Sequence, residues 1–119
     1  MRFGFSTNAF RQYGLAESIE ILADIGYDGV ELLFDQPHLY PPEATEAEVE
    51  SVRETLDAND IAISNCNAFM LTAIEDFHHP SFVEEDESYR RRRIEYTLDS
   101  LDTAAALDAE HISIEPGGP

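Results

Sequence analysis

The stretch Gly26-Tyr27-Asp28-Gly29-Val30-Glu31-Leu32 lies between a predicted helix and a predicted strand, and it indicates how the whole chain is built. Apolar residues recur at helical spacing over residues 15–23, and Gly26 follows them where a left-handed helix cap is expected. Residues 29–34 are expected to form a strand. Such a tight helix-to-strand turn is typical of folds in which strands and helices alternate.

The same unit repeats along the chain. Strands are predicted at residues 2–7, 29–34, 61–65 and 111–115, with a helix between each pair. Thr45 and Glu48 form a capping box before the second helix. The third helix, from about Ser88, is expected to turn its apolar residues to the core and its acidic residues to water. The expected buried positions are Ile94, Leu98, Leu101 and Ala105, and the expected exposed ones are Glu95, Asp99 and Asp102.

This order predicts an α/β fold with parallel strands and right-handed crossovers. The loops after the first three strands are long or rich in Gly and Pro, whereas the helix-to-strand turns are tight. Ligands are therefore expected at the carboxyl ends of the strands. Four parallel strands suffice for half a barrel or a small open sheet. Because no helix follows the last strand, we expect residues 1–119 to be the amino-terminal half of a truncated domain.

The charge of the chain is extreme. It has 25 Asp and Glu residues against 7 Arg and no Lys, which gives a formal net charge of −18. Such a surface repels phosphate backbones and anionic lipids, so nucleic-acid and membrane partners are disfavoured. Acidic surplus with Arg as the only strong cation is typical of halophiles, in which concentrated salt screens the carboxylates.

Cys66 is the single cysteine, so an internal disulfide is excluded and a reducing compartment is expected. The chain starts without the apolar run of a signal peptide, and no stretch approaches transmembrane length. These features predict a cytoplasmic protein. Cys66 has no evident cationic neighbour, so it is interpreted as a small buried residue and not as a nucleophile.

Several stretches carry a family resemblance when they are taken in order. They are Phe3-Gly4-Phe5-Ser6-Thr7-Asn8, the turn at residues 26–32, and Ile112-Ser113-Ile114-Glu115-Pro116-Gly117-Gly118-Pro119. Together they resemble the amino-terminal half of xylose isomerase-like TIM barrels, a superfamily of sugar phosphate isomerases and epimerases that also holds the endonuclease IV repair enzymes (AP endonuclease family 2). The resemblance implies parallel βα units of a (β/α)8 barrel, with about four strands and three helices present.

The resemblance also implies a divalent metal, Mn, Mg, Co or Zn, held by Glu, Asp and His at strand ends, mostly in the carboxyl-terminal half of the barrel. Epimerases of this group use two carboxylates to remove and return a proton beside a carbonyl that the metal polarises. A chain that matches the other half is expected to lack most of these groups. Its catalytic residues are therefore left unassigned.

Glu115 is the candidate metal ligand. If Ile112 and Ile114 meet the helices, Ser113 and Glu115 point into the barrel. A carboxylate there is costly unless it binds a metal, a substrate or a hydrogen-bond donor. By resemblance, the repair endonucleases carry a metal-binding His at this position, and this sequence departs from them.

The candidate substrate-binding residues are Glu31, Asn8, Asn67 and His79. Glu31 alternates with Val30 and Leu32, so it is expected to face inward; the alternative is a carboxylate satisfied by neighbouring strands. Asn8 and Asn67 follow the first and third strands and suit sugar hydroxyls, or else form turns. His79 lies in the long loop at residues 66–87 and could contact a ligand, or else is solvated or capping.

Other histidines, aromatic residues and arginines of the loops and of the third helix are not assigned to the site. His38 and His78 have the same two alternatives as the other loop histidine, and Phe69 and Phe82 are expected to pack the loop. Residues 90–93 are four consecutive arginines, which fan around a helix and are expected to pair with the acidic residues 84–87.

Three functions remain open. The first is a sugar or sugar-phosphate isomerase or epimerase that uses metal-assisted proton transfer next to a carbonyl. The second is an abasic-site endonuclease. The third is a non-catalytic half barrel that self-associates into a homo-oligomer and so covers its open edges.

Overall fold

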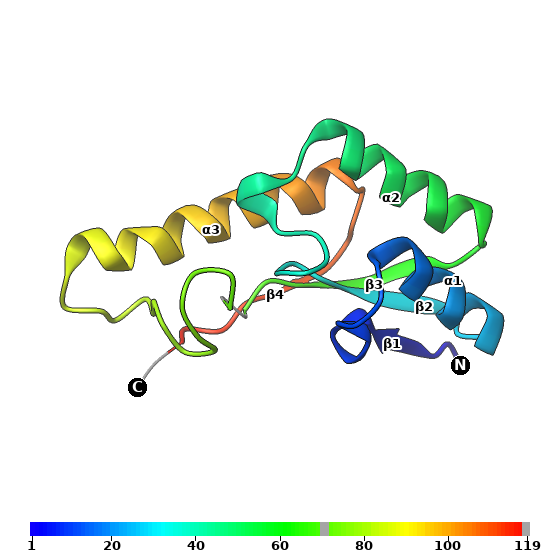
Figure 1. The fold of residues 1–119 in the computed structure, drawn as a ribbon, viewed down its shortest axis with the longest axis horizontal. Helices are drawn as coiled ribbons and strands as arrows, with labels where there is room; N and C mark the ends of the chain where they lie inside the picture. Colours follow the sequence, from blue (N-terminus) through cyan, green and yellow to red (C-terminus); the bar gives the residue numbers. More distant parts are fainter. Residues whose placement is uncertain (70–71, 118–119) are drawn as a thin grey trace.

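The computed structural model describes residues 1–69 and 72–117, in which strands and helices alternate (Figure 1). The elements are β1 (Gly4–Ser6), the 3-10 turn η1 (Thr7–Phe10), α1 (Leu15–Ile25), β2 (Gly29–Leu33), the 3-10 turn η2 (Pro41–Glu43), α2 (Glu46–Ala58), β3 (Ala62–Asn67), α3 (Glu87–Ala106) and β4 (Ile112–Ser113). One sheet in the order β1-β2-β3-β4 holds all four strands, and every neighbouring pair is parallel. The predicted α/β fold with sequential parallel strands is confirmed.

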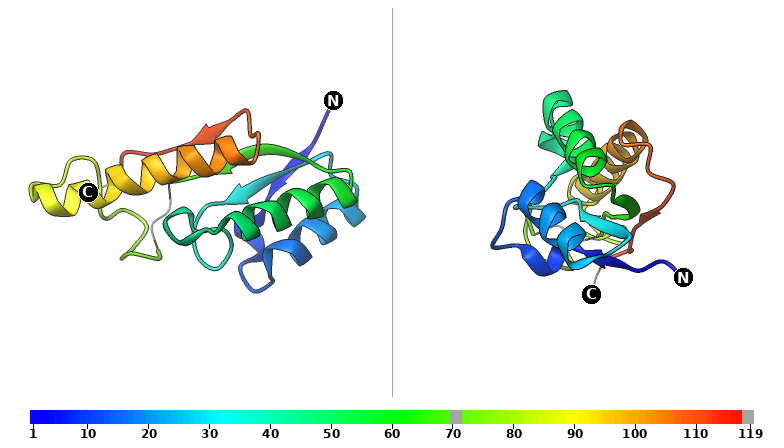
Figure 2. Two further views of the ribbon diagram at one scale, coloured as in Figure 1. Left: turned by 90° about the horizontal axis from the view of Figure 1, so that it is seen from above. Right: turned by 90° about the vertical axis from the view of Figure 1, so that its right-hand side faces the viewer.

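The helices cover one face of the sheet and leave the other face open (Figure 2). The core lies on the covered face and is built from the predicted stripes of α1 and α2 and from alternate residues of β2. Its members include Ile19, Leu22, Val30, Leu32, Val52 and Leu56. The open face carries small residues at its amino end: a Cβ at Gly4 would lie 3.0 Å from the Oγ of Ser64, and one at Gly29 would lie 3.2 Å from the Ser64 Cβ.

The local turn and capping signals are confirmed. Gly26 ends α1 with φ of 102°, in the left-handed region that glycine reaches without strain. Thr45 and Glu48 form the predicted capping box, with the Thr45 amide donating to Glu48 Oε2 at 2.8 Å and the Glu48 amide donating to Thr45 Oγ1 at 3.2 Å.

β3 departs from the prediction because it contains a bulge. The strand was expected to end at Asn65, and it instead runs through Cys66 to Asn67. Val30 of β2 pairs with Ile63, but Glu31 pairs with Asn65, so Ser64 is an extra residue. Because Ser64 has no partner in β2, each later residue of β3 faces the side of the sheet opposite to the one that strict alternation from Ile63 would give.

The expected buried stripe of α3 is wrong. Ile94, Leu98 and Leu101 are 40%, 55% and 45% exposed, and Ala105 is exposed as well. The face that packs on the core instead carries Arg93, Tyr96, Ser100, Thr103 and Ala104. Backbone carbonyls make the burial of two of these polar side chains possible: the Tyr96 hydroxyl donates to the Phe34 carbonyl at 2.6 Å, and the Ser100 hydroxyl donates to the Tyr96 carbonyl at 2.7 Å.

The long connection between β3 and α3 is pinned to the end of β2 by Asp35, which is fully buried. Its Oδ2 accepts from the amide and the hydroxyl of Thr72 at 2.8 and 2.6 Å, and its Oδ1 accepts from the amides of Ala73 and Gln36 at 3.0 and 2.8 Å. The connection is thus held at the carboxyl end of the sheet, beneath the amino end of α3 (Figure 1).

Candidate functional site

Glu31 is the centre of a polar cluster on the open face of the sheet. Asn65 Nδ2 donates to Glu31 Oε2 at 2.7 Å, and Asn67 Nδ2 donates to Glu31 Oε1 at 3.2 Å. Asn65 Nδ2 also donates to Ser113 Oγ at 2.8 Å, which joins β2, β3 and β4 through side chains. Glu31 and Ser113 therefore face away from the helices, as their alternation with apolar neighbours predicted. We call Glu31, Asn65, Asn67 and Ser113 the Glu31 cluster.

Asn65 was missed as a site residue, because strict alternation places it on the same face as Ile63. The bulge at Ser64 moves Asn65 to the open face and turns Cys66 into the core, where it is fully buried. The only hint in the sequence is the repeat Asn65-Cys66-Asn67, in which two polar residues flank a small apolar one.

The cluster stabilises a charged carboxylate. Burial by itself raises the pKa of Glu31, but hydrogen bonds from Asn65, Ser6 and Asn67 outweigh it, and the pKa is lowered from its ordinary value. All three are neutral donors, and Glu31 forms no ion pair with any described residue. The carboxylate therefore keeps its full negative charge, and it has acceptor capacity left for further donors.

Asn67 carries an acceptor without a partner. The side chain is 6% exposed, and no donor among the described residues reaches its Oδ1. The orientation of the amide is set by Glu31, because only the NH2 group can face a carboxylate. A buried acceptor left open in this way is costly unless a ligand or a water donates to it.

The other two predicted substrate-binding residues lie apart from these contacts. Asn8 is half-buried in η1, where its amide donates to Ser6 Oγ at 3.2 Å. His79 Nδ1 lies 2.7 Å from Glu84 Oε1 in the loop before α3, and this hydrogen bond raises the pKa of His79. The structure thus brings Glu31 and Asn67 into direct contact, and gives Asn8 and His79 contacts of their own.

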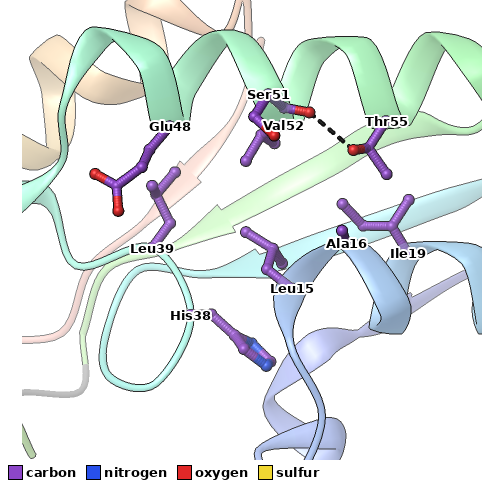
Figure 3. A pocket seen from close by; sticks show the side chains of 9 residues that line it. All are labelled: Leu15, Ala16, Ile19, His38, Leu39, Glu48, Ser51, Val52 and Thr55. Carbon is purple, nitrogen blue, oxygen red and sulfur yellow. Dashed lines mark hydrogen bonds between the residues drawn. The ribbon is translucent and has the colours of Figure 1, made fainter.

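His38 lies in the loop between β2 and α2 and is held against the connection between β1 and α1: Nδ1 lies 3.1 Å from Thr7 Oγ1, and Nε2 lies 3.1 Å from the Tyr13 carbonyl. Burial lowers its pKa, against the opposing effect of the carbonyls of Tyr13 and Phe10. The ring also lines a cavity of about 170 Å³ between α1 and α2 (Figure 3). That cavity lies on the helix-covered side of the sheet, so it is separate from the Glu31 cluster.

Glu115 lies beyond the end of β4, because the strand stops at Ser113. Its side chain is exposed and lines a cavity of about 290 Å³ with Phe69, Phe77, His78, Arg93, Pro116 and Gly117. No group of three or more His, Cys, Asp or Glu residues that could hold a metal occurs within residues 1–69 and 72–117. The described residues therefore do not by themselves provide a divalent-metal site.

The expected burial of Cys66 is confirmed. Burial, together with the nearby negative charge of Glu31, raises its pKa to about 12. Of the arginines at 90–93, Arg91 pairs with Glu87 at 3.1 Å as predicted, whereas Arg93 is buried against backbone carbonyls.

Comparisons with known proteins agree with this architecture. The family model described as "Xylose isomerase-like TIM barrel" matches residues 19–119, so this chain belongs to that family. No curated protein matches the chain. No helix in the described part of the chain has the length and apolar character needed to cross a membrane.

Three solved structures illustrate the fold. 3-Keto-D-glucoside 4-epimerase YcjR from E. coli superposes with a TM-score of 0.66 at 15% identity, over 94% of this chain and 36% of that one. The "probable 3-DHS dehydratase AsbF" from Bacillus anthracis gives 0.64 at 16% identity, over 96% and 38%. An AP endonuclease, family 2, from Brucella melitensis gives 0.64 at 20% identity, over 98% and 41%. At these identities the likeness concerns the fold alone, and this chain spans well under half the length of each of the three.

Proposed function

We propose that this chain supplies the sugar-binding part of an isomerase or epimerase that acts on a sugar or sugar phosphate. The observation that carries the proposal is the Glu31 cluster, in which a charged carboxylate and an open amide acceptor lie together on the face away from the helices. Both accept hydrogen bonds, and sugar hydroxyls are donors. Membership of the xylose isomerase-like family supports the same class of substrate.

The roles within the site follow from the chemistry of each group. Glu31 accepts from one or two hydroxyls of the sugar, and Asn67 Oδ1 accepts from a third. Asn65 is a positioning residue, because its two N–H bonds hold Glu31 and Ser113 in place. Asn8 and His79 are proposed to contact more distant parts of the substrate from the loops at this end of the sheet.

The proposed reaction is proton transfer at the carbon next to a carbonyl. In this family the chemistry is expected to need a divalent metal, and Glu115 is proposed as one of its ligands. Since the described residues lack a complete ligand set, further ligands must come from elsewhere, and no catalytic step is assigned to a residue of this chain. The protein is proposed to work in a salt-rich cytoplasm, on the basis of its charge of −18.

Exchange of substrate hydrogen with solvent deuterium tests this function. Aldoses, ketoses and their phosphates are incubated in D2O and molar KCl with Mn, Mg, Co or Zn, and the deuterium incorporated beside the carbonyl is measured by NMR. The assay is made on the complete enzyme, which includes the metal ligands that the described residues lack. We expect exchange for at least one sugar, and a loss of about tenfold or more in E31Q because charged hydrogen bonds to hydroxyls are removed. The matched control is Glu17→Gln on the exposed face of α1. Absence of exchange with every sugar and metal would contradict the proposal.

A second candidate is a half barrel that self-associates. β1 and β4 each have one neighbour in the described sheet, so each leaves one edge open. A second copy could pair with both edges and form a homo-oligomer. Its size in molar KCl, measured by light scattering, distinguishes the candidates: a dimer with no exchange activity supports self-association, and a folded monomer excludes it.

The third candidate is an abasic-site endonuclease, since an AP endonuclease of family 2 shares this fold. The net charge of −18 opposes it, because an anionic surface repels DNA unless salt screens it. Cleavage of an abasic duplex in the presence of zinc is the test, and activity that is absent at every salt concentration excludes this function.

A further inference from the structure

Arg93 is a buried cation with no anionic partner among the described residues. The side chain is 1% exposed, and its guanidinium lies 5.7 Å from the centre of the Phe82 ring. Nε donates to the Pro80 carbonyl at 3.0 Å, and Nη1 donates to the Phe69 carbonyl at 2.8 Å. These contacts fix the plane of the guanidinium and bind it to the start and to the middle of the loop between β3 and α3.

The second terminal nitrogen of Arg93 has no acceptor among the described residues. Nη2 is buried and unpaired, and no carboxylate within residues 1–69 and 72–117 forms an ion pair with this side chain. Burial lowers the pKa of Arg93, while Tyr96 and Glu115 act in the opposite direction. In a chain with 25 acidic residues, an unpaired buried arginine is unexpected, because desolvating a cation is costly unless a negative charge compensates it.

Arg93 is one of the residues that line the cavity at Glu115. Arg93 and Gly117 are both part of its wall, with Phe69, Phe77 and His78 around them. A Cβ at Gly117 would lie 3.0 Å from Nη2 and 2.6 Å from the His78 carbonyl, and φ at Gly117 is 76°. The backbone of Gly117 therefore lies close to Nη2, and a larger residue at position 117 would collide with the His78 carbonyl.

We propose that this cavity is a binding site for a small oxyanion, in which a phosphate or carboxylate oxygen accepts from Arg93 Nη2. Arg93 is well suited to this role because two of its three nitrogens donate to backbone carbonyls, which hold the third nitrogen, Nη2, in a fixed position. Phe69 and Phe77, whose rings are 5.3 Å apart, shield the contact from water and strengthen it. The site is distinct from the Glu31 cluster. It shares Glu115 with the proposed metal site, but binding of an anion to Arg93 does not require isomerase turnover.

Glu115 weakens binding of the anion, since its carboxylate lines the same cavity and carries the same charge as the ligand. This gives a test that leaves the buried arginine intact. Glu115 is exposed, so replacing it by Gln removes the repulsion without disturbing the core. We expect E115Q to bind the anion about twofold more tightly, because the exposed charge of Glu115 is largely screened in molar salt.

The experiment is calorimetric titration in molar KCl at constant ionic strength, with sodium phosphate in one arm and sodium acetate in the other. Saturable binding of phosphate alone identifies a phosphate site, and binding of acetate alone identifies a carboxylate site. R93K is expected to lose about tenfold or more in affinity, because the single ammonium nitrogen of a lysine cannot reproduce the planar spacing of the three guanidinium nitrogens. Arg91→Lys, on the exposed side of the same helix, is the matched control and should bind like the wild type.

Two results overturn the proposal. One is the lack of saturable binding of either anion by the wild type and by E115Q. The other is a fall in the stability of E115Q with no gain in affinity, which would mean that Glu115 compensates a purely structural arginine. If R93K does not fold, the comparison of E115Q with the wild type still decides between these outcomes. Turnover of a sugar is not measured, so failure here leaves the proposed isomerase function untouched.

Discussion

Asp35 and Glu31 are two carboxylates of the same strand region, and they are held in opposite ways. Asp35 is fully buried and accepts three of its four hydrogen bonds from backbone amides, those of Gln36, Thr72 and Ala73. Glu31 is partly exposed and accepts from the side-chain amides of Asn65 and Asn67. Neither forms an ion pair with a described residue. The kind of donor is the difference between them.

A backbone N–H cannot turn away, whereas a side-chain amide can rotate and present its oxygen. The surroundings of Asp35 therefore tolerate only a group that accepts at both oxygens, and this carboxylate is part of the structure. The surroundings of Glu31 can adapt to a neutral group or to a ligand. Adaptable donors beside an open acceptor are what a binding site needs, which is why the site is assigned to Glu31 and not to Asp35.

The largest expected effect is on Asp35. D35N should lower the free energy of unfolding by about 2–3 kcal/mol, because the new NH2 group faces amides that also donate and leaves them unpaired. Urea unfolding in molar KCl measures the change, with Asp57→Asn on the exposed face of α2 as the control. A loss no greater than that of the control would show that these hydrogen bonds do not hold the loop.

The same substitution at Glu31 should have a much smaller effect on stability. In E31Q the amide of Asn67 can turn over, so that its unpaired Oδ1 accepts from the new NH2 group. We expect a change within about 1 kcal/mol in either direction, because a partly buried charge is removed at the same time. Unfolding measured under the same conditions as for D35N is the check. A loss equal to that of D35N would remove the distinction between the two carboxylates.

Asn65 should control the titration of Glu31. The folded pKa of Glu31 is lowered, so its charged form contributes stability above the unfolded pKa, and this contribution is lost as pH falls through the folded pKa. Asn65→Ala removes the donor that lowers the pKa of Glu31 most, so the folded pKa of Glu31 should rise. The loss of stability should then begin at higher pH. NMR titration of the Glu31 carboxyl carbon measures the shift. Asn59→Ala, in the turn after α2, should leave it unchanged.

The smallest expected effect is on the reactivity of Cys66, whose pKa is raised in part by the negative charge of Glu31. With a pKa of about 12, the thiol is ionised in only about one molecule in ten thousand at pH 8, and alkylation of the native protein should be very slow. E31Q removes one cause of the raised pKa and should speed alkylation modestly. Iodoacetamide labelling followed by mass spectrometry gives the rates, and equal rates would mean that burial alone sets the pKa.

Local signals predicted much of the fold because their partners are close in the chain. Gly26 ends a helix through its own backbone, and the Thr45 capping box spans three residues, so both could be found from sequence. The inward orientation of Glu31 followed from alternation. Asp35 could not be interpreted in this way, since its partners at residues 72–73 lie 37 and 38 positions away and are backbone groups without a sequence signature.

α3 shows where periodicity fails. The stripe of Ile94, Leu98 and Leu101 satisfies every rule for a buried face, yet the helix buries Arg93, Tyr96 and Ser100. The burial of these polar side chains depends on carbonyls supplied by Phe69, Pro80, Phe34 and the helix itself, which only the folded chain brings together. A pattern of apolar residues predicts which faces can be buried, and tertiary contacts decide which face is.

The bulge at Ser64 acts on β3 as a frameshift acts on a gene. A strand has a reading frame of two, inside and outside, and one extra residue inverts that frame for every position downstream. Here the inversion sends Asn65 and Asn67 to the open face and Cys66 to the core. The insertion or deletion of a single codon in this strand is therefore enough to create or abolish the polar cluster, with no change in any of the residues that compose it.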